Sequence, residues 1–238
     1  MLTYNIYHGE RADGSGRSNL AEIASVIGEY QPDFVALQEV DSMTRRSAQI
    51  HEGAPVDLVQ ELARMCGMHG YFGKAMDYSD GGYGEGLLSR YPAQPEVYNL
   101  DTPAGGEPRA LIALTHTFSN GKTVVFAGTH LCHEFEANKL AQARQVADIL
   151  TGKGLPAIIA GDFNIQPGTE PYQALTARLD DAASVYGDPQ LTYPSTGPEI
   201  RLDYVFLSRN AAWKVKEVKV IQADASDHLP VLVTLEVE

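Results

Sequence analysis

The chain has 238 residues, of which 44% are hydrophobic, and this is enough for one well-buried domain. Its 31 Asp and Glu outnumber its 18 Lys and Arg, and the resulting net charge of −13 disfavours bulk nucleic acid as a substrate, although a small basic patch in a site could override this. No stretch approaches about 18 apolar residues and no signal peptide is recognised. We therefore expect a soluble protein without integral membrane contact, either cytoplasmic or exported with a leader that this chain lacks.

The N-terminal part of the chain predicts a helix followed by a buried strand. The helix is expected over residues 18–30, where Asn19 and Glu22 have the spacing of a capping box. The strand is expected over 33–39, an apolar run that ends at Glu39.

The middle of the chain contains a glycine-rich segment and a hairpin. Residues 81–84 lack the pattern of a nucleotide-binding loop, so we interpret them as a turn into a strand near Leu87. Two alternating runs, 110–118 and 123–129, are joined through Asn120-Gly121, a preferred hairpin turn. The other expected elements are helices over 56–65 and 136–150, strands over 156–160, 202–207, 214–221 and 231–237, and a loop-rich stretch over 168–198. No interdomain linker is visible, so we expect a single domain over 1–238.

Five polar clusters lie at the ends of these expected strands. They are Asn5, Glu39, His130, Gly161-Asp162-Phe163-Asn164 and Ser226-Asp227-His228. Each cluster alone is compatible with an ordinary turn, because Asp, Asn and Gly are common turn residues. Together they indicate one edge of the fold that presents functional side chains.

The motifs around these clusters follow the order of a known superfamily. They are Thr3-Tyr4-Asn5-Ile6, Leu37-Gln38-Glu39-Val40, Leu87-Leu88-Ser89-Arg90-Tyr91-Pro92, Thr129-His130-Leu131, Gly161-Asp162-Phe163-Asn164, Leu202-Asp203-Tyr204 and Ser226-Asp227-His228. In this series the chain resembles the endonuclease/exonuclease/phosphatase superfamily, which includes pancreatic deoxyribonuclease, AP endonucleases and sphingomyelinases. The resemblance implies an α+β fold, a four-layer α/β/β/α sandwich of two mostly antiparallel sheets flanked by helices. It also implies a divalent-metal phosphoesterase site at one end of the sandwich.

The residue types suit a metal-assisted reaction. Hydrolysis of a phosphate ester requires a cation that neutralises the non-bridging oxygens, and Mg²⁺ is held by one or two carboxylates. Glu39 is the best single ligand, Asn5 is expected to add a neutral oxygen, and Asp227 is expected to point toward the metal. Mn²⁺ or Ca²⁺ are alternatives to Mg²⁺. His8 and His133 are candidates for the rim of the site.

Two further pairs are assigned to the chemistry. Asp162 and Asn164 alternate along the chain, so both side chains face the same way and are expected to orient water or a phosphate oxygen; the alternative is an Asx turn. The resemblance implies that Asp203 holds the imidazole of His228, which would stabilise charge on the phosphorus or move a proton.

A second imidazole and two arginine segments complete the candidate set. By resemblance to the pancreatic nucleases, Glu85 is expected to pair with His130, raise its pKa and make it an acid for the leaving group. Arg109 resembles an arginine that faces the phosphate in sphingomyelinase-like relatives, with a surface salt bridge as the alternative. Arg45 and its neighbour Arg46 are expected to line the mouth of the site.

These features predict a divalent-metal-dependent phosphodiesterase or phosphomonoesterase. A small soluble phosphoester is the expected substrate, because the chain lacks the basic loops of repair endonucleases and the aromatic hairpin of membrane-acting sphingomyelinases. The expected pairing of Glu85 with His130 keeps a nonspecific nuclease as an alternative. A catalytically silent binding module on the same fold is the alternative from another class. We expect a monomer.

Overall fold

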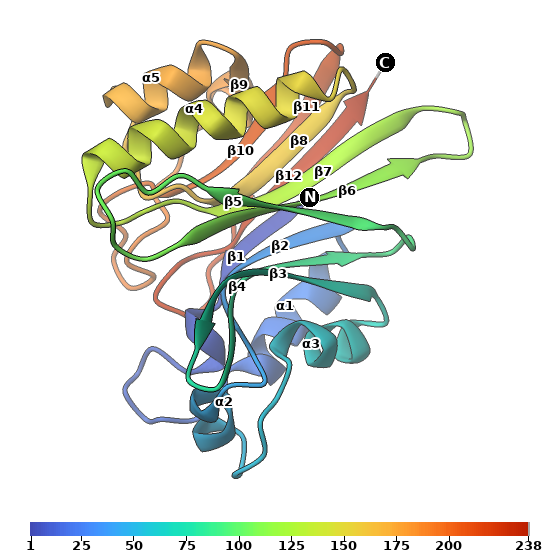
Figure 1. Cartoon of the computed structure of the whole chain (residues 1–238). Helices are drawn as coiled ribbons and strands as arrows, with labels where there is room; N and C mark the ends of the chain where they lie inside the picture. The colour runs from blue at the N-terminus through green and yellow to red at the C-terminus, as the bar shows by residue number, and fades with distance from the viewer. Residues whose placement is uncertain (238) are drawn as a thin grey trace.

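The computed structural model describes residues 1–237 as two stacked six-stranded sheets with helices on their outer faces (Figure 1). In spatial order, the first sheet contains β11 (Trp213–Val220), β12 (Val231–Val237), β1 (Leu2–Asn5), β2 (Phe34–Ser42), β4 (Gly81–Ser89) and β3 (His69–Tyr78). The second contains β5 (Pro95–Leu100), β6 (Arg109–Thr117), β7 (Thr123–His130), β8 (Ala157–Asp162), β10 (Asp203–Ser208) and β9 (Leu179–Asp181). Each sheet has one parallel pair, β1 with β2 and β7 with β8, and is otherwise antiparallel. The predicted α/β/β/α sandwich is confirmed.

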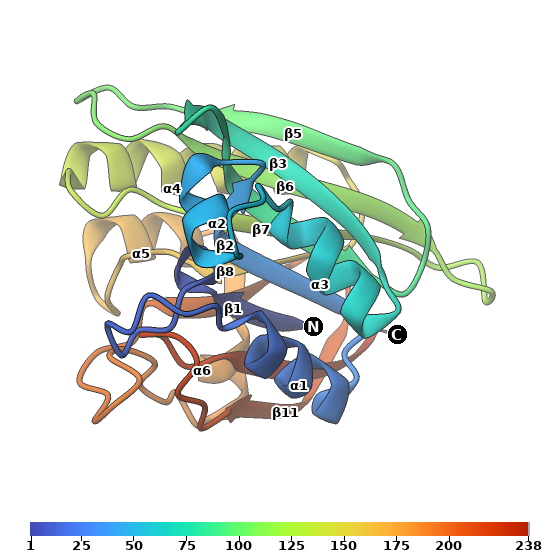
Figure 2. The ribbon, with the colours of Figure 1, turned by 90° about the horizontal axis from the view of Figure 1, so that it is seen from below.

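The helices form the two outer layers, seen from the side in Figure 1 and from below in Figure 2. Helices α1 (Leu20–Tyr30) and α3 (Leu58–Cys66) pack on the first sheet, and α4 (Glu136–Gly152) and α5 (Glu170–Thr176) pack on the second. The short elements are the 3₁₀ turn η1 (Tyr7–Gly9), α2 (Arg45–Ile50) and α6 (Ala182–Tyr186). Within the described part of the chain, no helix has the length and apolar character required to cross a membrane.

The central strands are apolar because both of their faces are buried. In β2, Val35 and Leu37 pack against the helices, whereas Phe34 and Ala36 point between the two sheets. Fully burying one such large side chain contributes about 1.5–3 kcal/mol. The apolar run of residues 34–37 therefore reflects the part of the strand that lies between two cores, and the polar residues of the site follow it.

Three predicted details differ from the structure. Residues 81–84 are not a loop but the first half of β4, and the turn lies one step earlier at Ser79 and Asp80, which have positive φ angles of 47° and 63°. A Cβ on Gly84 would lie 2.1 Å from the carbonyl oxygen of Gly73, so this glycine allows close strand pairing.

The other two differences concern helix α1 and the region after α4. Asn19 does not cap α1 through its side chain; it donates instead to the backbone oxygens of Ile6 and Ala225, at 2.9 and 3.0 Å. The stretch 168–198, expected to be loop-rich, contains α5, β9 and α6.

Candidate active site

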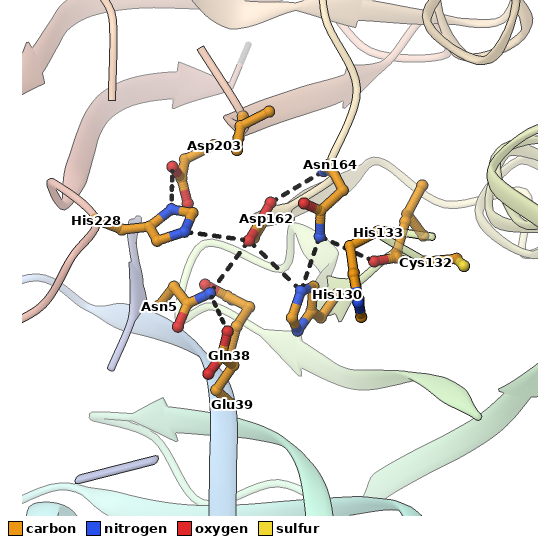
Figure 3. A network of polar contacts seen from close by, with 12 residues as sticks. Asn5, Gln38, Glu39, His130, Cys132, His133, Asp162, Asn164, Asp203 and His228 are labelled. Carbon is orange, nitrogen blue, oxygen red and sulfur yellow. Dashed lines mark hydrogen bonds and ion pairs between the residues drawn. The ribbon is translucent and has the colours of Figure 1, made fainter. Parts of the chain in front are cut away.

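The candidate site forms where polar residues at the strand ends of the two sheets face one another (Figure 3). The second sheet contributes one residue from each of four adjacent strands: Asp203 of β10, Asp162 of β8, His130 of β7 and Arg109 of β6. The first sheet contributes Asn5 of β1, Glu39 of β2 and His228, which precedes β12. Because adjacent strands lie about 4.8 Å apart, the row from Asp203 to Arg109 extends over roughly 14 Å.

Asp162 lies at the centre of the polar network. Its Oδ2 accepts a hydrogen bond from Asn5 Nδ2 at 3.1 Å and lies 3.4 Å from His130 Nε2 and 3.6 Å from His228 Nε2. Its Oδ1 accepts from the backbone N–H of Asn164 at 2.9 Å. Burial raises the pKa of this carboxyl above its usual range. The surrounding groups therefore hold one buried carboxylate in a fixed orientation.

The predicted pairing of His228 with Asp203 is present. His228 Nδ1 lies 2.9 Å from Asp203 Oδ2, and both side chains are buried. Burial alone would lower the pKa of His228, but the carboxylates of Asp203 and Asp162 outweigh it and raise the pKa to about 10. The imidazole is therefore cationic at neutral pH. Ligand atoms of these three residues lie within 4.8 Å of one another, a spacing that could also hold a metal ion.

Glu39 is directed into the site by an irregularity of its strand. The pairing of β2 with β4 shifts register between Leu37 and Val40, and Glu39 has a φ angle of 57°. Its Oε1 accepts from Asn5 Nδ2 at 3.1 Å, and its Oε2 lies 3.7 Å from His8 Nδ1. Burial opposes its ionisation, but the hydrogen bonds of His8 and Asn5 and the charge of His228 outweigh this and lower its pKa to about 2. Glu39 therefore remains anionic.

Three residues of the site have a left-handed backbone conformation. Besides Glu39, His8 and Asn164 have positive φ angles, 44° and 50°. Such conformations cost on the order of 1–3 kcal/mol each in a residue with a side chain and persist where surrounding contacts enforce them. These three residues line the same cavity, so the strain is stored at the candidate site.

The donor set suits a hard divalent cation. Glu39, Asp162 and Asp227 line one cavity, and none of the three forms an ion pair with a Lys or Arg among residues 1–237. Their basic neighbours are imidazoles, His8 beside Glu39 and His228 beside Asp162. Carboxylate oxygens are preferred ligands of Mg²⁺ and Ca²⁺. Glu39 and Asp227 therefore remain the predicted metal ligands.

Asn5 occupies a different position from the one expected for a neutral oxygen ligand. Its Oδ1 accepts from the backbone N–H of Tyr7 at 3.2 Å. Its Nδ2 donates to both Glu39 and Asp162, and so the amide faces these carboxylates with its nitrogen. Asn5 thus holds two carboxylates at a fixed separation.

The expected pairing of Glu85 with His130 does not form. No hydrogen bond or ion pair joins the two side chains in the described residues, and Glu85 Oε2 is buried without a partner. Arg109 Nη1 instead lies 2.9 Å from His130 Nδ1. Burial and the Arg109 charge lower the pKa of His130 well below its usual value, opposite to the predicted direction. Burial also raises the pKa of Glu85 well above its usual range.

Arg109 organises this side of the site. It is buried rather than on the surface, but it does form an ion pair, with Glu107. Its Nη2 lies 3.0 Å from His133 Nδ1. Because a guanidinium can only donate, each of these Nδ1 atoms is an acceptor, and the remaining proton of a neutral His130 ring lies on Nε2. The carboxylate of Asp162 lies 3.4 Å from that nitrogen. The amide nitrogen of Asn164 lies closer to Nε2, at 2.9 Å, so Arg109, Asn164 and Asp162 together fix the ring of His130.

Of the two neighbouring arginines, only Arg46 lines the cavity. The side chain of Arg45 is 76% exposed and forms an ion pair with Asp80 outside it, so Arg45 does not occupy the predicted position at the mouth. Arg46 donates from Nε and Nη2 to both oxygens of the buried Asp41, at 2.8 and 2.7 Å. Helix α2 points one arginine outward and the next inward.

The cavity has a volume of about 440 Å³ and includes several residues that the motifs did not identify. These are Tyr83, Glu107 and Tyr193. Leu202 of the Leu202-Asp203-Tyr204 motif also lines the cavity, and so do His8 and His133, as expected of rim residues. The Tyr193 ring lies 4.7 Å from that of His228. Tyr193 lies in a loop, and no local sequence pattern marks it as a site residue. Tyr83 lies between glycines, a pattern that indicates close packing.

Comparison with known proteins identifies relatives along the whole chain. YbhP, an uncharacterized protein of Escherichia coli strain K12, is 27% identical over 247 residues, which cover 97% of this chain and 93% of YbhP.

Two solved structures have the same fold. Bt3783, a mannosyl-6-phosphatase of Bacteroides thetaiotaomicron, matches 99% of this chain and 98% of its own with a TM-score of 0.79 and 20% identity. The human Nocturnin catalytic domain with bound sulfate matches 100% of this chain and 92% of its own, with a TM-score of 0.76 and 22% identity. The family model described as Endonuclease/Exonuclease/phosphatase family matches residues 2–228, and the chain belongs to this family.

Proposed function

We propose that the protein is a divalent-metal-dependent hydrolase of phosphate esters that acts on a small substrate. The observation that carries the proposal is the arrangement around Asp162, a buried carboxylate between the cationic His228 and the ionised Glu39. This arrangement combines an acceptor for a water proton, a fixed positive charge and a metal ligand in one cavity. Members of the family hydrolyse phosphate esters, and this supports the assignment.

Each residue has a distinct proposed role. Asp162 orients the attacking water and accepts its proton, and Asn164 holds the water or a phosphate oxygen. His228, fixed by Asp203, donates hydrogen bonds to the phosphoryl oxygens as negative charge develops on them. His130 acts as a neutral N–H donor rather than as the acid expected from a pairing with Glu85, because Arg109 lies against its ring. Arg109 is a positioning residue for His130.

Glu39 and Asp227 would hold the metal, with Asn5 keeping the carboxylate of Glu39 in place. When bound, a cation such as Mg²⁺ neutralises the non-bridging oxygens of the ester. Family enzymes generally use divalent metals, and this supports the proposal.

Three observations favour a small ester over nucleic acid. The chain carries a net charge of −13, so its surface repels a polyanion. The cavity of about 440 Å³ is in the range of small-molecule sites. The pairing of Glu85 with His130, which was the reason for considering a nuclease, is absent. The fold shared with a mannosyl-6-phosphatase is consistent with a phosphorylated small molecule as substrate.

The proposal is tested by turnover of generic esters. We expect hydrolysis of p-nitrophenyl phosphate or bis-p-nitrophenyl phosphate in Mg²⁺ or Mn²⁺, abolished by EDTA and restored by added metal. Glu39→Gln should raise the metal concentration needed for half-maximal rate, because one anionic ligand is lost, whereas Arg45→Gln outside the cavity should not. Absence of turnover with every metal would contradict the proposal and leave the silent binding module. Turnover that persists in EDTA would contradict the dependence on a metal.

A further inference from the structure

The cavity extends well beyond the groups needed for the chemistry. Asp203 and His228 lie at one end, and the strand order β10-β8-β7-β6 places Arg109 three strands away. At that far end the cavity is lined by Arg46, Tyr83, Glu107 and Arg109, which we call the distal lobe. Arg109 contacts His130, which lies 3.4 Å from Asp162, so the lobe adjoins the position of a phosphoryl group bound at Asp162 and faces the remainder of the substrate.

Arg46 is held rigidly in the distal lobe. Two of its nitrogens donate to Asp41, and its guanidinium lies 4.6 Å from the ring centre of Tyr78 and 5.4 Å from that of Tyr83. Its Nη1 makes no hydrogen bond to residues 1–237. A guanidinium fixed in this way offers donors to a ligand at little cost in side-chain entropy.

Tyr83 and Glu107 offer further polar atoms. The hydroxyl of Tyr83 makes no hydrogen bond within the described chain, and burial raises the pKa of this tyrosine well above its usual value, so it stays protonated. Glu107 is anchored by its Oε1, 2.8 Å from Arg109 Nη1, and its side chain is 29% exposed. The distal lobe therefore presents a donor, a hydroxyl that both donates and accepts, and a carboxylate acceptor.

The charges of the distal lobe balance. Arg46 is paired with Asp41, and Arg109 is paired with Glu107. No uncompensated cation remains there for a second phosphate. The Tyr83 ring is already flanked by Arg46 and by Tyr78, whose ring centre is 5.9 Å away, so its hydroxyl is the group available to a ligand. Both features disfavour a charged or flat aromatic leaving group.

We propose that the distal lobe binds an uncharged polyhydroxylated leaving group, a sugar or another polyol, through Arg46, Tyr83 and Glu107. A hydroxyl donates one hydrogen bond and accepts others, so neighbouring hydroxyls satisfy a fixed mixture of donors and acceptors. Groups that lack hydroxyls leave the same atoms unpaired once water is displaced, which lowers affinity. This inference rests on the proposed phosphoester hydrolysis and names the class of ester.

The test compares kcat/KM for glucose 6-phosphate, phenyl phosphate, AMP and fructose 1,6-bisphosphate in Mg²⁺. We expect glucose 6-phosphate to be preferred over phenyl phosphate by about tenfold or more. Tyr83→Phe, which removes only a hydroxyl, and Glu107→Gln should each lower this ratio by about tenfold. Arg46→Lys should also lower it, and Arg45→Lys, on the same helix but outside the cavity, should leave it unchanged.

The outcomes separate this inference from the proposed function. If esters are hydrolysed but the ratio is the same in the wild type, Tyr83→Phe and Glu107→Gln, the distal lobe does not bind hydroxyls, while the hydrolase stands. A preference for AMP, phenyl phosphate or the bisphosphate also overturns the inference. If no ester is hydrolysed, the proposed function fails, and titration calorimetry decides the inference: tighter binding of glucose 6-phosphate than of phenyl phosphate supports it, and equal binding overturns it.

Discussion

Asp162 illustrates how burial and partners together define a reactive carboxylate. Removing it from water disfavours its charged form, and the nearby His228 and the amide of Asn5 favour that form.

The sequence predicted the pairing of Asp203 with His228 correctly, because both belong to motifs. It mispredicted the partner of His130, because Arg109 reaches that ring from the adjacent strand β6, a contact that no local motif contains.

Asp203→Asn should weaken catalysis through His228. We expect the pKa of His228 to fall from about 10 toward its ordinary value, because the closest carboxylate is neutralised. The turnover number at neutral pH should fall by about 10² or more. An NMR titration of the imidazole and a kcat–pH profile measure the two effects. Asp180→Asn, whose partner Arg209 lies outside the cavity, serves as the control. An unchanged His228 pKa in Asp203→Asn would contradict this role.

His228 should also make stability depend on pH in the metal-free protein. Its pKa of about 10 exceeds the value of about 6.5 for an unfolded chain, so the folded state binds the proton more tightly. The stabilisation is complete below pH about 6.5 and is lost as the pH rises toward 10, by at most about 5 kcal/mol and less if Asp162 shares the interaction. Urea unfolding in EDTA should show this decline, and His228→Gln should reduce it. Parallel pH profiles for the two proteins would refute the assignment.

At the scale of the elements, glycines account for the misassignment of residues 81–84 and for the irregular pattern of β3. Gly70 and Gly73 interrupt the pattern of β3, yet a Cβ on Gly73 would lie 2.8 Å from the Cβ of Ile112. Their absent side chains allow the sheets and helices to approach closely, which is a tertiary requirement. The glycines among residues 81–84 likewise suggested a loop, because their role in close strand pairing is not visible in the local sequence. Strands with regular apolar patterns, such as β8, were predicted closely.

Gly161→Ala should separate strands that carry the site. A Cβ there would lie 2.0 Å from the carbonyl oxygen of Thr129, on the neighbouring strand β7. We expect a loss of about 2–4 kcal/mol in the free energy of unfolding, and reduced activity because His130 moves away from Asp162. The control is Gly28→Ala in helix α1, where no atom lies within 4 Å and a gain of up to about 1 kcal/mol is expected. Denaturant titrations of both variants check the difference, and equal stabilities would contradict the close packing.

At the scale of the whole molecule, the site is a consequence of strand order. Residues from six of the seven motifs, spread from Asn5 to His228, converge because their strands meet at the same edge of the sandwich (Figure 3). The family resemblance, rather than hydrophobic periodicity, predicted this convergence. It could not predict the distal lobe, because Arg46, Tyr83 and Glu107 meet only through the packing of β4, α2 and the start of β6.

The class of substrate should be visible in the salt dependence of kcat/KM. For a small ester, kcat/KM should change little between about 50 and about 200 mM salt, because few counterions are released on binding. A polyanion as true substrate would give a steep decrease of log kcat/KM with log salt. Measuring both a p-nitrophenyl ester and single-stranded DNA over this range distinguishes the two cases.

The most direct measurement is the turnover number of Asp162→Asn beside the wild type, in saturating Mg²⁺, on the generic ester hydrolysed fastest. The substitution retains the shape of the side chain and removes the negative charge that faces His228, His130 and Asn5. We predict a decrease of about 10² or more in kcat, with circular dichroism showing a folded protein. Wild-type turnover by folded Asp162→Asn would contradict the assignment of this site to phosphoester hydrolysis.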